Sequence, residues 1–465
     1  MSLQNTEYGK DKVSELLKDA QNIYFLGIGG ISMSALAKMT VAQGFCAGGY
    51  DRVESNITKK LEDLNIPVYY ELDPSRVEKY DALVYTVAIS EDNPEYLKAK
   101  EIGIPVISRA DYLGYIMSSY KKRIGISGMH GKSTTTAMVA SVFDAGDADP
   151  TVLSGAELKG IESSYKAGGI DNFIFEACEY KDSFLKFYPS VAVVLNIDLD
   201  HLDYFSGLDH IKRSFSNFIS KCGKDGVAVL NFDDANVRDV AKDYSGKKVT
   251  FGIEADDVDF RAVNIKHENR RSCFDIICPD MRVCHIELGV MGEHYVMDAL
   301  AAAATGFTCG ITDDGVKKGL LTFNGIRRRM DYRGKFEDAD VYDDYAHHPT
   351  EIRSTLKSAE KLGYDKIWCV YQPHTYSRTA ALYDDFVSAF NDVESNMIFT
   401  DIYAARETNE WGITSEKLAS DVEGSKYFSA YDEIIGYLKQ NVSKNDAIII
   451  MGAGDIYCIF YQMGV

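Results

Sequence analysis

The amino-acid sequence predicts an α/β fold in which helices cover parallel sheets. Apolar segments of strand length alternate along the chain with segments of helical periodicity, which is the order that strand–helix–strand units produce. Most of the apolar segments end in a polar or glycine-bearing loop, and ligands of open parallel sheets bind beyond such strand ends. The 465 residues are enough for about three domains of ordinary size.

Composition and charge exclude several classes of protein. The chain is 46% hydrophobic and 26% charged, which suits a globular protein with a buried core. Its net charge of −20 argues against nucleic-acid binding, because that binding requires a cationic face. Residues 1–19 lack the apolar core of a signal sequence, and the longest apolar runs are too short to span a membrane. Nine cysteines without a C-x-x-C pair indicate free thiols, so we expect a cytoplasmic protein.

The N-terminal region is expected to open with a strand, a glycine turn and a helix. The strand covers residues 22–26 and the helix residues 32–43, with further strands at 82–87 and 105–107 before the region ends near Ser118. The turn at 27–34 resembles the G-x-G-x-x-G fingerprint, with Ser32 in place of the third glycine. Asp51 follows where a ribose-binding carboxylate is expected. The turn either holds a diphosphate or has no ligand, and taken alone it favours a nicotinamide enzyme.

A second glycine-rich turn follows an apolar strand at 123–127 and opens a helix at 134–143. It has the short phosphate-loop form G-x-x-G-K-S-T. Backbone N–H groups at a helix N-terminus suit an anion, Lys132 adds a charge for the terminal phosphates, and the Ser133 hydroxyl can hold magnesium. The turn predicts a nucleoside triphosphate site formed by Gly128, Met129, His130, Gly131, Lys132, Ser133 and Thr134.

The central region continues with strands at 173–176, 191–197 and 227–230, and two of them end in acidic segments. Glu176 and Glu179 follow the first, and the segment 196–203 follows the second with three aspartates and His201. Acidic loops after a phosphate loop suggest a divalent cation, magnesium or manganese. The alternative for the aspartates is helix capping and solvation. Residues 260–288 alternate like antiparallel strands, and an alanine-rich helix is expected at 296–305.

The last region repeats the pattern, with strands at 366–371, 397–402 and 447–451. The segment 343–349 mixes acids, a tyrosine and two adjacent histidines, a combination that favours function over an ordinary surface. The segment 372–378 places Arg378 at a strand end, where it can pair with a carboxylate or a phosphate. An arginine in a loop is otherwise a common surface residue.

Together, these segments resemble the Mur ligases over residues 23–456, nearly the whole chain. The resemblance rests on motifs that occur in one order at 27–34, 128–134, 196–201, 343–351, 372–374 and 452–456. It implies a Rossmann-like domain at 1–119 that binds a UDP sugar and a central phosphate-loop ATPase domain at 120–327 with a mixed or parallel sheet. A Rossmann-like C-terminal ligase domain is implied at 328–465.

The resemblance further implies ATP-dependent addition of L-alanine to UDP-N-acetylmuramate through an acyl phosphate, in peptidoglycan precursor synthesis. The implied cofactor is Mg²⁺ or Mn²⁺, held by Ser133, Glu176 and His201. The implied catalytic residues are Lys132, Glu176, His201, His347 and Arg378. Arg329 and Asp344 would contact the nucleotide. The UDP sugar would contact Gly29, Gly30, Ile31, Ser32 and Asp51. We expect a monomer or a weak dimer.

The chain departs from the family pattern at several positions. Tyr295 and Asp298 replace two asparagines expected near adenine, Thr375 stands where an arginine is common, and Met330 replaces a usual phenylalanine. Three alternatives remain: a ligase that attaches a recycled murein tripeptide to the same sugar nucleotide, a nicotinamide dehydrogenase, and a catalytically inactive nucleotide-binding protein. Selectivity among alanine, glycine and serine is left open.

Overall fold

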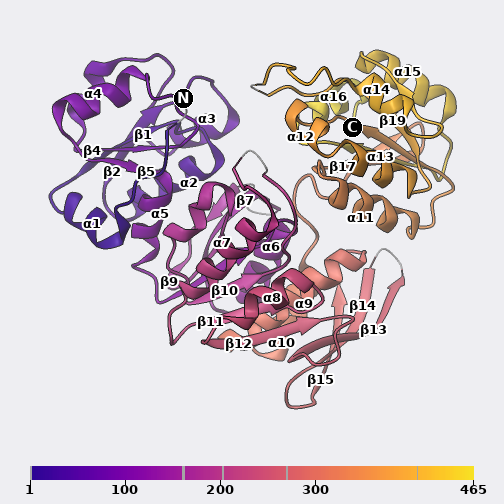
Figure 1. Cartoon of the computed structure of the whole chain (residues 1–465), viewed down its shortest axis with the longest axis horizontal. Coiled ribbons are helices and arrows are strands. Elements are labelled where there is room, and N and C mark those ends of the chain that lie inside the picture. Colours follow the sequence, from indigo (N-terminus) through magenta and orange to yellow (C-terminus); the bar gives the residue numbers. More distant parts are fainter. Residues whose placement is uncertain (1–2, 160–162, 202–203, 269–270, 406) are drawn as a thin grey trace. The chain divides into compact units, whose positions relative to one another are not determined.

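The computed structural model describes residues 3–159, 163–201, 204–268, 271–405 and 407–465. Within them, the strands form three sheets, of five, ten and six strands, and helices pack against the sheets (Figure 1). The chain divides into two compact units. The first comprises Met1–Lys266, Cys273–Leu288 and Val296–Phe323, and the second comprises His267–Ser272, Gly289–Tyr295 and Asn324–Val465. None of the described helices is both long enough and apolar enough to cross a membrane.

The N-terminal sheet has the strand order β3-β2-β1-β4-β5, and its neighbouring strands are parallel. Its strands are β1 (Asn22–Leu26), β2 (Cys46–Tyr50), β3 (Val68–Tyr69), β4 (Ala82–Tyr85) and β5 (Val106–Ser108). Its helices are α1 (Gly9–Leu16), α2 (Ile31–Ala42), α3 (Asn56–Glu62), η1 (Pro74–Lys79), α4 (Pro94–Ile102) and α5 (Arg109–Met117).

Both faces of this sheet are covered, as expected for parallel strands. Ile23 and Phe25 of β1 pack into the core that also contains α2 and α5. The alternate residues Tyr24 and Leu26 belong to a second cluster that includes residues of η1 and α4. The first of these cores continues into the central sheet, where it includes Phe175, and this continuity joins the N-terminal and central sheets in the first unit.

The central sheet has the order β15-β14-β13-β12-β11-β10-β6-β9-β7-β8. Its strands are β6 (Lys122–Ser127), β7 (Pro150–Leu158), β8 (Ser163–Lys166), β9 (Gly169–Glu176), β10 (Val191–Val194), β11 (Val227–Asn231), β12 (Lys247–Gly252), β13 (Phe260–Glu268), β14 (Arg271–Ile277) and β15 (Val283–Leu288). Its helices are α6 (Lys132–Ala145), η2 (Tyr180–Lys186), α7 (Leu208–Ser220), α8 (Ala235–Lys242), α9 (Glu293–Cys309) and α10 (Asp313–Thr322).

The register of this sheet brings three loops together. The strand β6 pairs in parallel with β9 on one side and with β10 on the other. Ile126 lies opposite Glu176, and Ser127 lies opposite Val194. The segments that follow β6, β9 and β10 therefore begin side by side at one edge of the sheet, which is where ligands of parallel sheets bind.

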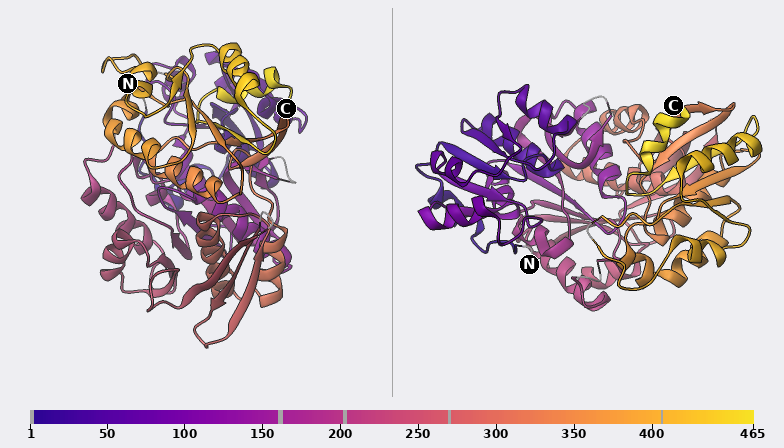
Figure 2. Two further views of the ribbon diagram at one scale, coloured as in Figure 1. Left: turned by 90° about the vertical axis from the view of Figure 1, so that its right-hand side faces the viewer. Right: turned by 90° about the horizontal axis from the view of Figure 1, so that it is seen from above.

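The C-terminal sheet has the order β16-β17-β21-β18-β19-β20 and is parallel except for the pair β16–β17. Its strands are β16 (Asp331–Phe336), β17 (Ala339–Asp344), β18 (Ile367–Tyr371), β19 (Asn396–Phe399), β20 (Lys426–Tyr427) and β21 (Ala447–Met451). Its helices are α11 (Pro349–Glu360), α12 (Tyr376–Ala381), α13 (Tyr383–Asn391), α14 (Ser415–Ser420), α15 (Tyr431–Asn441), η3 (Ile456–Cys458) and α16 (Ile459–Met463). Two separate clusters bury its two faces, one under α11, α13 and α14 and the other under α15 and α16. Figure 2 shows the C-terminal part of the chain in orange to yellow, with helices on both sides of its strands.

The expected elements occur, with differences at their ends. The strands expected at 82–87, 191–197 and 397–402 end earlier, at Tyr85, Val194 and Phe399. The buried apolar residues Leu195 and Ile197 follow β10 and account for the longer strand that was expected at 191–197. The Leu195 N–H still donates to the Ser127 carbonyl of β6 at 3.0 Å, but the Ile197 N–H donates to Asp234 at 3.2 Å instead of to a strand. The phosphate-loop helix begins at Lys132, two residues before the expected start.

Candidate active site

The turn between β6 and α6 is held by glycines in conformations that other residues rarely adopt. Gly128 has φ +146° and Gly131 has φ +81°. A Cβ atom on Gly131 would lie 2.7 Å from Oδ1 of Asp298, so a side chain at this position would displace Asp298. The same Oδ1 atom accepts a hydrogen bond from the Thr135 hydroxyl at 2.9 Å. Asp298, one of the departures from the family pattern, therefore packs directly against the glycine turn.

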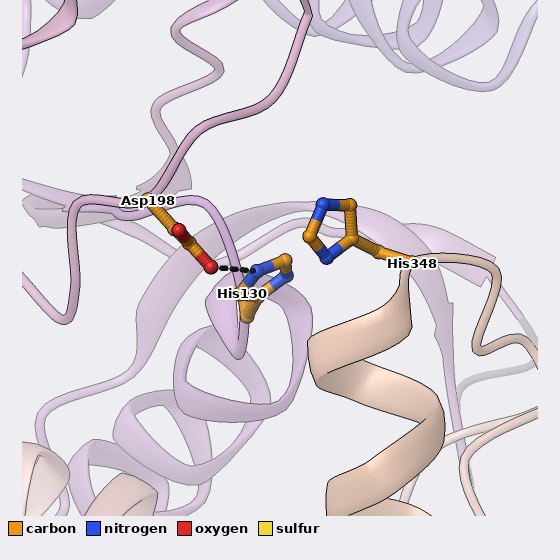
Figure 3. Close-up of side chains that lie close together, drawn as sticks. All are labelled: His130, Asp198 and His348. Carbon is orange, nitrogen blue, oxygen red and sulfur yellow. Dashed lines mark ion pairs between the residues drawn. The ribbon is translucent and has the colours of Figure 1, made fainter. Parts of the chain in front are cut away.

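Asn196, on the loop after β10, braces the same turn. Its Oδ1 atom accepts a hydrogen bond from the His130 N–H at 2.8 Å, and its Nδ2 atom donates to the His130 carbonyl at 3.0 Å. The Nε2 atom of His130 lies 3.6 Å from a carboxylate oxygen of Asp198 (Figure 3). Asn196 and the segment it begins thus contribute to the shape of the phosphate loop. Asp203, the last residue of the predicted acidic segment 196–203, lies outside the described residues.

Lys132 is the first residue of α6, and its ammonium is shielded from solvent. It donates hydrogen bonds to the carbonyls of Gly128 at 2.6 Å and Met129 at 3.1 Å, and it lies 3.1 Å from Oε2 of Glu179. Desolvation favours the neutral amine, but the charge of Glu179 and its neighbours outweighs it, so the pKa of Lys132 is above its ordinary value. Lys132 stays charged, with its donors turned inward toward the loop.

Ser133 and Glu176 form a second contact at the same sheet edge. The Ser133 hydroxyl donates to Oε2 of Glu176 at 2.8 Å, and the Gly155 N–H donates to the same oxygen at 2.7 Å. A hydroxyl and a carboxylate that converge in this way are oxygen ligands suited to a hard cation such as Mg²⁺. Thr134, the next residue, is buried in α6.

Glu179 is a residue of the site for which the sequence alone predicted no role of its own. Its side chain is only 1% exposed and contacts both Lys132 and His201, whose Nε2 atom lies 3.3 Å from Oε1. Burial favours the neutral acid, but Lys132 and His201 outweigh it and hold the pKa of Glu179 below its ordinary value. His201 therefore pairs with Glu179, whereas Glu176 contacts Ser133. The acidic segment 176–179 pointed to this carboxylate, but the sequence did not show which of its two acids faces the lysine.

The glycine turn of the N-terminal sheet is also braced by a carboxylate. Oδ2 of Asp51 accepts a hydrogen bond from the Gly29 N–H at 2.8 Å. Gly30 is the N-cap of α2, Ile31 is exposed, and the Ser32 hydroxyl accepts a hydrogen bond from Arg109 at 3.1 Å. Arg109 has no motif around it, so the sequence alone gives no sign that it lies at this turn.

The other four predicted site residues, Arg329, Asp344, His347 and Arg378, belong to the second unit, where Glu351 joins two of them. Arg329 lies 3.3 Å from Oε1 of Glu351, and His347 donates its backbone N–H to Oε2 at 3.2 Å. Asp344 accepts hydrogen bonds from the N–H groups of Met330 at 2.8 Å and Ala346 at 2.9 Å. Arg378 donates to the His374 carbonyl at 3.1 Å.

Burial sets the charge states in this cluster. Desolvation opposes the charge on Arg329, but Glu351 and Asp344 outweigh it and raise the Arg329 pKa. Burial raises the pKa of Asp344 above its ordinary value. Burial lowers the pKa of His347 to about 4 even though Glu351 acts in the opposite direction. His347 is therefore a neutral imidazole at pH 7.

Two further departures have defined contacts. The Tyr295 hydroxyl donates to the Arg329 carbonyl at 3.0 Å. The Thr375 hydroxyl donates to Glu407 at 2.7 Å, and Glu407 also accepts hydrogen bonds from the backbone N–H and the hydroxyl of Ser377. Thr375 is thus part of a hydrogen-bond network at the start of α12.

Comparison with protein families assigns nearly the whole chain. The family described as Mur ligase family, catalytic domain, matches residues 22–121, and the Mur ligase middle domain matches residues 126–306. The family described as Mur ligase, glutamate ligase domain, matches residues 328–454. The three matches follow the N-terminal, central and C-terminal sheets in order.

Individual proteins match over similar lengths. The chain is 42% identical over 443 residues to a protein of Alkaliphilus metalliredigens named UDP-N-acetylmuramate–L-alanine ligase, covering 94% of this chain and 96% of the relative. A protein of the same name from Acetivibrio thermocellus is 42% identical over 442 residues, 94% of each chain. The solved UDP-N-acetylmuramate-alanine ligase of Thermotoga maritima is 25% identical with a TM-score of 0.80, covering 95% of this chain and 98% of that one. On this similarity in sequence and fold, the chain belongs to the Mur ligase family.

Proposed function

We propose that the protein joins L-alanine to UDP-N-acetylmuramate in an ATP-dependent reaction that forms an amide bond and releases ADP and phosphate. This reaction is a step of peptidoglycan precursor synthesis. One observation carries the proposal: the ends of β6 and β9 bring the phosphate-loop residues Lys132 and Ser133 together with Glu176 and Glu179, and His201 from the loop after β10 contacts Glu179. Relatives that are 42% identical over nearly the full length bear the name of this activity.

The chemistry requires activation, because a carboxylate does not condense with an amine while its leaving group is hydroxide. The carboxylate of the sugar nucleotide attacks the γ-phosphorus of ATP, ADP leaves, and an acyl phosphate forms. The amine of alanine then attacks the acyl carbon, and phosphate leaves the tetrahedral intermediate. Lys132 and the N–H groups at the start of α6 stabilise the charge on the transferred phosphoryl group.

A divalent cation fits the oxygen ligands at this edge of the sheet. We assign Ser133 and Glu176 as its ligands, with His201 as a further ligand held by Glu179. When bound, Mg²⁺ or Mn²⁺ would neutralise phosphate charge. The turn residues Gly128, Met129, His130, Gly131 and Thr134 enclose the phosphates.

The second unit supplies residues for the nucleotide and the amino acid. We assign Arg329 and Asp344 to nucleotide contacts, and His347 and Arg378 to the amino acid and the reacting carboxylate. A histidine whose pKa is about 4 is a weak base toward an alkylammonium. His347 therefore orients the amine through hydrogen bonds, and the amine reacts from its small neutral fraction.

The proposed division of labour follows three regions. Residues 1–119 bind the UDP sugar through Gly29, Gly30, Ile31, Ser32 and Asp51; residues 120–327 bind ATP; and residues 328–465 bring the amino acid.

All nine cysteines are described and none forms a disulfide, which agrees with the cytoplasmic site of action that we propose. We propose a monomer or weak dimer that binds neither nucleic acid nor membranes.

Phosphate release tests the function directly. The purified protein is incubated with ATP, Mg²⁺ and UDP-N-acetylmuramate, and L-alanine, glycine, L-serine or a murein tripeptide is added in turn. Release should require the sugar nucleotide and should be fastest with L-alanine. If, among the added amine substrates, only the tripeptide stimulates phosphate release, the protein is the recycling ligase. If release does not depend on the sugar nucleotide, the proposed function is wrong. Unchanged nicotinamide absorbance in parallel samples would exclude the dehydrogenase.

A further inference from the structure

Arg109 is a partly buried cation that forms no ion pair with any described residue. Its Nη1 atom donates to the Ser32 hydroxyl at 3.1 Å. Desolvation lowers the pKa of this guanidinium, and the group that acts in the opposite direction is the thiol of Cys178 rather than a carboxylate. The other shielded cations of the candidate site are different, because Lys132 pairs with Glu179 and Arg329 pairs with Glu351.

The fold places Arg109 at the edge of the N-terminal sheet where its ligand is expected. Arg109 directly follows β5, and the glycine turn directly follows β1. The strand β4 lies between them, and all three strands are parallel, so their carboxyl ends share one edge. The order of this sheet reverses beside β1, and open sheets bind ligands at such a point. Arg109 therefore reaches the turn from the neighbouring strand end.

The carboxylate at this turn, Asp51, is bound to the Gly29 N–H at 2.8 Å and forms no ion pair with Arg109. The N-cap of α2 is Gly30, which offers no capping side chain, and the first turn of α2 contains no acid. Arg109 is itself the first residue of α5. A cation at the N-terminus of a helix opposes the helix dipole. The one acid in the first turn of α5, Asp111, accepts hydrogen bonds from the Thr6 hydroxyl at 2.6 Å and the Tyr8 N–H at 3.1 Å instead.

We propose that Arg109 binds the diphosphate of the sugar nucleotide, together with the backbone N–H groups at the start of α2. This inference rests on the proposed function and adds a binding residue to it. A guanidinium and free helix N–H groups are complementary to a dianion, and the planar fork of arginine matches phosphate oxygens. The lack of an ion pair between Arg109 and a described carboxylate is then a property of the binding site, because the substrate supplies the negative charge that neutralises Arg109.

Calorimetric titration of two sugar nucleotides tests this role. UDP-N-acetylmuramate carries a diphosphate and a carboxylate, whereas UDP-N-acetylglucosamine carries the same diphosphate without the carboxylate. Arg109→Ala should weaken the binding of both by roughly ten- to a hundredfold, the range for a charge-assisted hydrogen bond. The affinities of Arg109→Lys should lie between those of the wild type and those of Arg109→Ala. Lys79→Ala, which removes an exposed cation from η1, is the matched control and should bind like the wild type.

Thermal unfolding without ligand separates binding from structure. Removing a cation that has no acidic partner should leave the midpoint of Arg109→Ala equal to or above that of the wild type. A lower midpoint combined with unchanged affinities would make Arg109 structural and overturn the proposal. Weaker binding of UDP-N-acetylmuramate alone would assign Arg109 to the carboxylate and overturn the diphosphate contact. A wild type that binds neither sugar nucleotide would instead reject the proposed function itself.

Discussion

The ammonium of Lys132 lies 3.1 Å from the carboxylate of Glu179, and both groups are shielded from solvent. Glu179 also lies 3.3 Å from His201, so one acid connects the phosphate-loop lysine with the predicted metal ligand. Without nucleotide, Lys132 and Glu179 each neutralise the charge of the other. A triphosphate at the loop would compete with Glu179 for the lysine, so stability and catalysis are coupled at this contact.

Lys132→Ala should lower turnover by at least about a hundredfold, because the transferred phosphoryl group loses a charged donor. It should also lower the unfolding temperature, since Glu179 is left as a buried charge with one partner fewer. The double variant Lys132→Ala, Glu179→Gln should recover the unfolding temperature but not the turnover. Near wild-type phosphate release by Lys132→Ala would contradict the assignment of the phosphate loop.

Glu179→Gln should lower kcat by about tenfold or more while KM for ATP stays level or falls. The reason is that His201 loses its anchor, whereas the phosphates lose a repulsive neighbour. Without nucleotide the variant should be less stable by about 3 kcal/mol, as when a buried ion pair is broken. Saturating ADP should shrink that deficit, because the phosphates then compensate Lys132. A deficit that persists unchanged with ADP would argue against the coupling.

Glu176→Gln should weaken the apparent affinity for Mg²⁺ in the phosphate-release assay by about tenfold or more. A neutral amide is a poorer ligand for a hard cation than a carboxylate. Ser133→Ala should act in the same direction, because Ser133 donates to the same carboxylate at 2.8 Å. The exposed Glu157 of β7 provides the control Glu157→Gln, for which the Mg²⁺ titration should match the wild type. Equal Mg²⁺ dependence in all four proteins would move the metal elsewhere.

Gly131→Ala should destabilise the protein by more than the roughly 1–2 kcal/mol that a left-handed backbone costs a non-glycine residue. Its new Cβ atom would also collide with Asp298, 2.7 Å away. Gly103→Ala isolates the backbone effect, because Gly103 has φ +76° and no atom within 4 Å of its Cβ position. Urea denaturation of the two variants measures the difference. Equal losses of unfolding free energy in the two variants would show that Asp298 moves away from the new Cβ atom at little cost.

Acidification should destabilise the protein partly through His294. Burial, with help from Arg329 and His267, lowers its pKa from 6.5 to about 4. The unfolded chain therefore takes up a proton below pH 6.5 that the folded chain does not accept until about pH 4. The stabilising contribution is complete above pH 6.5 and is lost as the pH falls through this window, by about 3 kcal/mol. Unfolding free energies measured from pH 7.5 to 4 should show this loss.

His294→Gln should flatten the pH dependence of unfolding in the same window, because the titrating group is gone. Gln440→Ala, which changes an exposed residue of α15 without an ionisable group, is the control and should retain the wild-type slope. If His294→Gln has the wild-type slope, the acid lability has another source.

Much of the fold follows from local patterns, and the site follows only in part. The strand at Asn22–Leu26 and the strand at Ala447–Met451 have the predicted bounds, because both are short apolar runs that end at glycine or a polar residue. The predicted strand ends are wrong where apolar residues continue past the paired positions, as at Ile197, which is buried but bonds to the Asp234 side chain. The alternation of strands and helices is a property of the sequence, whereas the order of strands within a sheet depends on contacts between distant segments.

The pairings within the site depend on such contacts. Glu176 and Glu179 have the same chemistry and are three residues apart, so spacing alone does not decide which acid meets Lys132. Two non-glycine residues with positive φ, Lys181 and Asp182, follow Glu179, and no local propensity predicts that bend. Arg109 could not be predicted from the sequence either. Its proposed role depends on its contact with Ser32 and on the lack of an ion pair with any described carboxylate, and both are properties of the folded chain. The roles assigned to these residues remain predictions until the variants are measured.

The brace that Asn196 forms across the phosphate loop has a kinetic consequence. Because its amide satisfies both the N–H and the carbonyl of His130, the loop keeps its curvature without nucleotide. An incoming triphosphate then meets a loop that is already shaped at His130, so less conformational entropy is lost on capture and association does not wait for this peptide to become ordered.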